Sequence, residues 1–131
     1  MRLVLCATLL LVACTFGQTA NVVDSVPVKT CSVTGFTCQV LQESMNDVGL
    51  SLQNNVGTDL SSAIVALQTT DCYLQLPVIA VGSIPADAIT PVHFYCAGSV
   101  PDVFAGKLTV TYSSNGGAVS HTAEGSITIR G

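Results

Sequence analysis

The chain has 131 residues, which suits one domain of ordinary size, and its composition is apolar and poor in charge. Charged residues make up 9% of it, where an ordinary soluble domain carries about a quarter. The formal net charge of −4 and the lack of any basic patch exclude nucleic acid as an expected partner, and the 49% hydrophobic content argues against disorder.

An apolar run from Leu3 to Gly17 follows a single charged residue, Arg2. The run is shorter than the roughly 20 residues of a membrane-spanning helix, and it is typical of a secretion signal. Small residues at the positions that a signal peptidase reads predict cleavage before Gln18, which makes residues 1–17 a signal peptide. Two alternatives stay open. Residues 11–14, "LVAC", resemble a bacterial lipoprotein box in which Cys14 carries lipid, or the run remains as an uncut anchor.

The segment from Gln18 to Thr30 follows the predicted cleavage site. Pro27 bars it from a central position in a sheet. The plain interpretation is an edge strand or a linker, and the alternative is a strand donated to the sheet edge of a neighbouring copy. The residues that would form this edge or donor strand are Val22, Val23, Val26 and Val28.

Four cysteines remain in either exported form: Cys31, Cys38, Cys72 and Cys96. In an oxidising compartment they most simply form two disulfides. Three pairings are possible. The preferred pairing joins Cys31 to Cys38, which closes a short local loop, and Cys72 to Cys96, which links distant strands. The sequence thus predicts a disulfide-bonded domain over residues 31–131 and an extracellular, secreted location.

Apolar residues alternate with a period of two along the chain, as they do in half-buried strands. Ala63 to Leu67 is apolar on both faces, as a central strand is, while Pro77 favours an edge or a bulge for the segment around it. The expected inward residues of the other segments are Phe36, Cys38 and Val40; Val48, Leu50 and Leu52; Leu74, Leu76, Val78 and Ala80; and Val92, Phe94 and Cys96.

The clearest predicted hairpin joins Phe104–Tyr112 to Val119–Ile129. Asn115-Gly116 supplies the positive φ angles of a tight turn. No segment after the signal shows a helical stripe over a dozen residues. The predicted fold class is therefore all-β, an antiparallel Ig-like β-sandwich of about seven strands preceded by the N-terminal apolar signal segment.

No group of residues in the sequence predicts catalysis. His93 is expected on the outward face of its strand and His121 on the inward face of another, whereas a metal site needs three or four convergent ligands. No serine lies in a G-x-S-x-G turn, and no glycine-rich phosphate loop occurs. We therefore expect a protein that is not an enzyme, with no catalytic residue, no cofactor and no metal.

Three stretches, "TCSVTGFTC", "VGLSLQNNVGTDLSSAIVAL" and "FAGKLTVTYSSNGGAVSHTAEGSITIR", resemble the extracellular sandwich of pilin-like surface proteins of archaea. The resemblance covers Cys31 to Arg130 and consists of low-charge strands, an N-N-x-G turn and a terminal hairpin. The N-terminus differs, because a pilin keeps a long apolar helix and this apolar run is short. The resemblance implies a surface module with no catalytic residue.

These features predict a structural or adhesive module that associates with copies of itself, or with other surface proteins, at the cell surface or in a filament. A charge-poor surface suits contact with protein, although an ordinary secreted domain with a hydroxyl-rich surface has the same composition. The alternative function is a secreted sandwich that binds a small apolar ligand such as a lipid between its sheets. A membrane is an expected partner only if Cys14 is lipidated.

Overall fold

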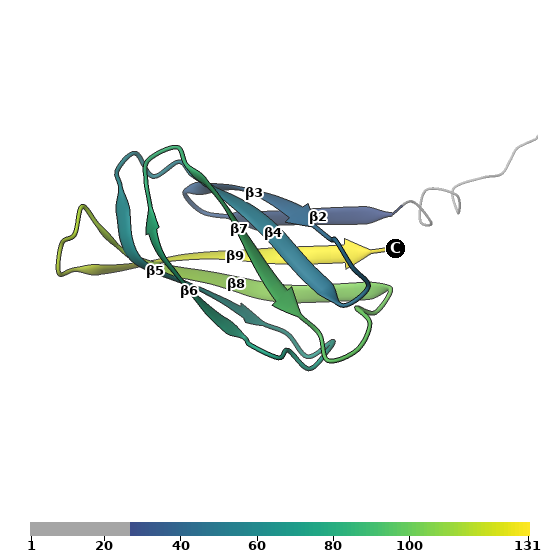
Figure 1. Cartoon of the computed structure of the whole chain (residues 1–131). Helices are drawn as coiled ribbons and strands as arrows, with labels where there is room; N and C mark the ends of the chain where they lie inside the picture. The colour runs from purple at the N-terminus through teal and green to yellow at the C-terminus, as the bar shows by residue number, and fades with distance from the viewer. Residues whose placement is uncertain (1–26) are drawn as a thin grey trace, which may run out of the picture.

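The computed structural model describes residues 27–131, and all of its regular elements are β-strands (Figure 1). In chain order they are β2 (Val28–Val33), β3 (Phe36–Leu41), β4 (Asp47–Asn54), β5 (Leu60–Gln68), β6 (Val78–Ile84), β7 (Ile89–Tyr95), β8 (Val103–Ser114) and β9 (Ser120–Arg130). The predicted signal peptide over residues 1–17, with Cys14, and the segment 18–26 lie outside the described residues. Between residues 27 and 131 there is no helix with the length and apolar character needed to cross a membrane.

The eight strands form one antiparallel sheet in the order β6-β5-β8-β9-β2-β3-β4-β7, which curls into a nearly closed barrel (Figure 1). The all-β, antiparallel class is therefore as predicted, with eight strands in place of about seven. The sheet is continuous because β2 pairs with both β3 and β9. Gly125 allows this close approach, since a Cβ there would lie 1.9 Å from the Ser32 carbonyl oxygen.

The interior is filled by large apolar side chains from both halves of the sheet. The expected inward sets of β4 and β7 are confirmed, because all six of their side chains are buried. Burial of this apolar surface is the main force that holds the curled sheet together. The largest fully buried apolar side chains are Phe94, Phe104, Leu50, Leu52, Leu60, Ile84, Leu108 and Ile127.

The terminal hairpin is confirmed as β8 and β9, with positive φ angles of 51° at Asn115 and 71° at Gly116. The expected inward position of His121 is wrong, because this side chain is exposed. His121 pairs with Tyr112 near the tip of the long hairpin, beyond the packed interior, and its ring stacks on the tyrosine at 5.6 Å between centroids.

The expected inward set around Pro77 is wrong at Leu76, Val78 and Ala80, which are exposed, whereas Leu74 packs against the core as predicted. Leu76 and Val78 are 67% and 55% exposed, and Ile79 packs against the core instead. The strand begins only at Val78, and it is apolar on both faces, so alternation could not identify its inner side. Gly82, with a φ of 86°, lies at a bulge opposite Ala63 that shifts the alternation again.

Val28 belongs to β2, which is an inner strand paired within its own chain. Val28 to Thr30 pair with Thr128 to Arg130 of the same chain, whereas β2 is in register with β3 only at Val33 and Phe36. Val22, Val23 and Val26 lie outside the part of the chain that the structure describes.

Both predicted disulfides are present, with the preferred pairing. Cys31–Cys38 joins β2 to β3, and Cys72–Cys96 joins the loop before β6 to the residue after β7. Two disulfides in a domain of this size are consistent with an oxidising compartment.

The first and last strands of the sheet, β6 and β7, approach one another without pairing. At one end of this seam the buried Asn54 amide donates hydrogen bonds to the carbonyl oxygens of Thr58 (2.9 Å) and Ile84 (3.0 Å). At the other end the Gln75 N–H donates to the Tyr95 carbonyl oxygen (2.9 Å), next to the Cys72–Cys96 disulfide. The seam is therefore held at both ends and open between them.

We expect removal of the Cys72–Cys96 disulfide to destabilise the domain more than removal of Cys31–Cys38. The two bridges close loops with sequence separations of 24 and 7 residues. On the chain-entropy model these loops correspond to about 3 and about 2 kcal/mol of the free energy of unfolding. Denaturant titration of the two double alanine variants measures both values, and a larger loss from the Cys31/Cys38 variant would contradict this order.

Candidate functional site at the open edge of the sheet

β6 presents unpaired backbone groups along one side. The Leu67 N–H donates to the Pro77 carbonyl oxygen (2.9 Å), and Val65 is in register with Ile79. Alternate residues of an antiparallel pair direct their backbone groups to the partner strand, so Ile79 faces β5. Val78 and Ala80 therefore direct their N–H and C=O groups to the free side, where no described strand pairs with them.

The opposite edge, β7, is partly protected. The N–H of Cys96 donates to the Asn46 carbonyl oxygen (2.9 Å), which fixes the alternation so that Ile89, Pro91, His93 and Tyr95 face the free side. Pro91 has no N–H to offer a new strand, and the Tyr95 carbonyl oxygen already accepts from Gln75. Proline and a covering loop are two of the devices by which proteins block edge pairing.

β6 has neither device between Val78 and Val81. The strand sequence VIAVGSI contains no charged residue and no proline, and its one irregularity, the bulge at Gly82, comes after this stretch. A short uncharged edge of this kind is a template for an added strand.

The outer face beside this edge is apolar as well. Ile64 lies opposite Ala80, and Ala66 lies opposite Val78, in the register of β5 and β6. Ile64 is 40% exposed and Val78 is 55% exposed. We name these four residues the β6 edge face. An added strand would thus gain both backbone hydrogen bonds and buried apolar area.

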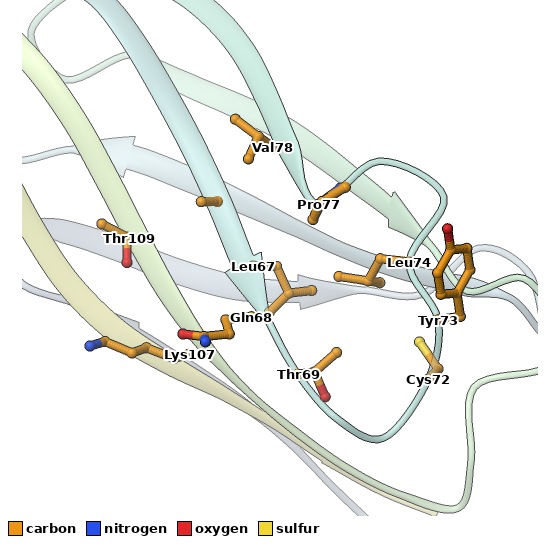
Figure 2. Close-up of a pocket in the computed structure, with 11 residues that line it drawn as sticks. Leu67, Gln68, Thr69, Cys72, Tyr73, Leu74, Pro77, Val78, Lys107 and Thr109 are labelled. Carbon is orange, nitrogen blue, oxygen red and sulfur yellow. The ribbon is translucent and has the colours of Figure 1, made fainter.

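A groove of about 450 Å³ continues from the edge face toward the Cys72–Cys96 disulfide (Figure 2). Figure 2 shows Tyr73 and Cys72 at one end of the groove and Thr109 toward the other. Lys107 is the only charged residue in the lining, which is otherwise apolar or hydroxyl-bearing except for the amide of Gln68. The lining residues are Ala66, Leu67, Gln68, Thr69, Cys72, Tyr73, Leu74, Pro77, Val78, Lys107 and Thr109.

The loop that carries Tyr73 is held in place by several contacts. The Ala97 N–H donates to the Tyr73 carbonyl oxygen (2.8 Å), and the Ala105 N–H donates to an Asp71 carboxylate oxygen (2.8 Å). Tyr73 nevertheless exposes 80% of its surface. An anchored loop that presents an exposed aromatic ring is suited to contact a partner, because little conformational entropy is lost when it binds.

The sequence did not identify this site. The alternation of apolar residues predicted Val78 and Ala80 on the inner face, and no feature of the sequence singled out Tyr73. The signal that was present is the run Val78 to Val81, apolar at every position directly after Pro77, which is typical of an edge strand with one face uncovered.

No known protein family, curated protein or solved structure matches the chain. The functional inference therefore depends on the chemistry of the β6 edge face and the groove.

We expect the amide of Ile79 to exchange with solvent at least tenfold more slowly than those of Val78 and Ala80 in dilute monomer. The first is bonded to β5 and the other two face solvent. Hydrogen exchange followed by NMR measures this difference. Equal protection of all three amides in the monomer would mean that the edge is already covered.

Proposed function

We propose that the protein is a non-enzymatic, extracellular structural or adhesive module that associates with copies of itself through β6. The observation that carries this proposal is the stretch Val78–Val81, an edge without charge or proline that borders an apolar outer face. The other edge, β7, is partly blocked by Pro91 and by the bond from Gln75 to the Tyr95 carbonyl oxygen, so β6 is the more open edge for an added strand. The domain would belong with Ig-like surface modules such as those of archaeal pilin-like proteins.

The occupant that we propose for the edge is the segment Gln18–Val26 of a second copy. This segment lies between the predicted cleavage site and the first described residue, Pro27. Seven of its nine residues, if extended, would reach about 23 Å, which is the length of the seven-residue strand β6. The segment contains three valines and one charge, Asp24, so it offers apolar side chains to the β6 edge face and meets no like charge on β6.

The predicted export of the chain supports a role at the cell surface. The apolar N-terminal run predicts a secretion signal, and the two disulfides suit the compartment to which that signal leads. At the cell surface, a domain with few charges and one uncovered edge would meet other copies at high local concentration.

We expect Ala80→Lys to prevent self-association and leave the domain folded. Ala80 is exposed on β6, so a lysine there is tolerated by the monomer, and its charge on the edge opposes strand addition. Light scattering and sedimentation of the mature protein at increasing concentration measure the change. Thr30→Lys, at an exposed position on the inner strand β2, is the matched control and should associate as the wild type does. Wild-type protein that remains monomeric at every concentration would contradict the proposal.

A deletion tests the proposed donor. Removing Ala20–Val26 while keeping Pro27 and β2 should leave a stable, folded domain that no longer assembles. Circular dichroism and thermal unfolding check the fold, and light scattering checks the assembly. Assembly that survives this deletion but is lost in Ala80→Lys would mean that another part of the second copy pairs with β6. Loss of the fold would mean that the segment belongs to its own domain.

The second candidate function is the binding of an apolar ligand, and the groove favours it. Its volume of about 450 Å³ falls within the range of small-molecule sites, and Leu67, Leu74 and Pro77 supply an apolar lining. Such a ligand would lie in the surface groove, because side chains such as Phe94 and Phe104 fill the interior. Organic extraction and mass spectrometry of native protein distinguish the two functions. A ligand-loaded monomer would support a carrier, and ligand-free assemblies would support a structural module.

A further inference from the structure

Glu43, Asp47 and His93 converge on the outer side of β4 and β7. One potential ligand atom from each lies within 4.8 Å of the others. Asp47 begins β4, Glu43 lies in the preceding loop, and His93 stands opposite Gly49 in the β4–β7 register. The cluster thus joins three residues that are up to 50 positions apart in the sequence.

Asp47 is the buried centre of the cluster. Its side chain is 1% exposed, and its carboxylate oxygens lie 3.0 and 3.1 Å from His93 Nδ1. The Glu43 N–H also donates to it (2.9 Å). Among residues 27–131, the one ion pair made by a lysine or arginine is Lys107–Glu124, so no such residue neutralises Asp47. A buried carboxylate is costly unless a positive charge compensates it.

The His93 ring packs closely over Gly49. A Cβ at residue 49 would lie 2.6 Å from His93 Nδ1 and 2.3 Å from the Leu41 carbonyl oxygen, so only glycine leaves room for the ring. The Tyr95 ring lies nearly parallel to it, with centroids 6.1 Å apart. The ring therefore presents Nδ1 to both oxygens of Asp47.

The pair is close enough for a shared hydrogen bond, and it is also close enough to share an ion. Nδ1 lies 3.0 and 3.1 Å from the two carboxylate oxygens of Asp47. The same separations of about 3 Å are close to those between neighbouring ligands of a tetrahedral ion with bonds of about 2.0 Å. Glu43 offers its ligand atom from an exposed position within 4.8 Å of the other two, so its side chain would move closer to complete such a set.

We propose that Glu43, Asp47 and His93 bind a divalent first-row transition-metal ion, with Zn²⁺ as the representative. The imidazole favours such ions over Ca²⁺ and Mg²⁺, which prefer all-oxygen sites. Three protein ligands with water in the fourth position form a recognised zinc arrangement. The four described cysteines are paired in disulfides and do not compete for the ion. The ion would tie the β3–β4 loop to β7. The expectation of no metal rested on sequence spacing, which does not show that β4 and β7 are neighbours.

Isothermal titration of the mature, disulfide-bonded protein with Zn²⁺ tests the site. We expect one ion per chain, binding weakened at least tenfold in Glu43→Gln and no binding in His93→Gln. Glu43 is exposed, so its variant should fold normally whatever happens to His93→Gln. His121→Gln replaces the other described histidine, which is exposed on β9, and should bind zinc as the wild type does. Zn²⁺ should also raise the Tm of the wild type and leave that of His93→Gln unchanged.

Several results would overturn the proposal. These are wild-type protein that binds no Zn²⁺ at millimolar concentration, zinc binding that is unchanged in both Glu43→Gln and His93→Gln, and binding that is lost in His121→Gln. Ca²⁺ binding with no dependence on His93 would rule out the imidazole as a ligand. Ala80→Lys should bind zinc normally, so the test does not depend on self-association.

Discussion

The pairing of β2 with β9 is the constraint on which the rest of the structure depends. It joins two groups of strands into one curled sheet, with β6 and β7 as its ends. The curl brings these ends near one another, but the turn held by Asn54 and the disulfide at Cys72 fix them without letting them pair. A fully closed barrel has no edges, and a nearly closed one has a seam whose two strands must each be protected or used.

The two edge strands that border this seam differ in how many of their free backbone groups are blocked. On β7, Pro91 removes one N–H from the free side, and the Tyr95 carbonyl oxygen there already accepts from Gln75. On β6 the corresponding stretch is apolar, uncharged and free of proline. This asymmetry argues for a function of β6, because both edges derive from the same curl and only β7 carries blocking features.

The sequence predicted what depends on local pattern. The terminal hairpin was predictable because Asn115-Gly116 marks its turn and each strand alternates cleanly, and the cysteines paired as their spacing suggested. The face of β6 was not predictable, because residues 78–81 are apolar on both sides. The contact of His93 with Asp47 was not predictable either, since it follows from the β4–β7 register and from the space above Gly49.

The asymmetry of the edges also bears on the form of an assembly. Two copies that paired through β6 alone would make an isologous dimer, and association would stop there. A strand donated from the N-terminal side of one copy to β6 of the next uses two different surfaces, so each added copy offers a new free β6. Such head-to-tail contacts close into a ring or continue as a filament. Because Pro91 removes an N–H from β7, lateral pairing at that edge would be weaker than strand addition at β6. If the proposed strand donation occurs, a single-file fibre or ring is therefore the architecture that it favours.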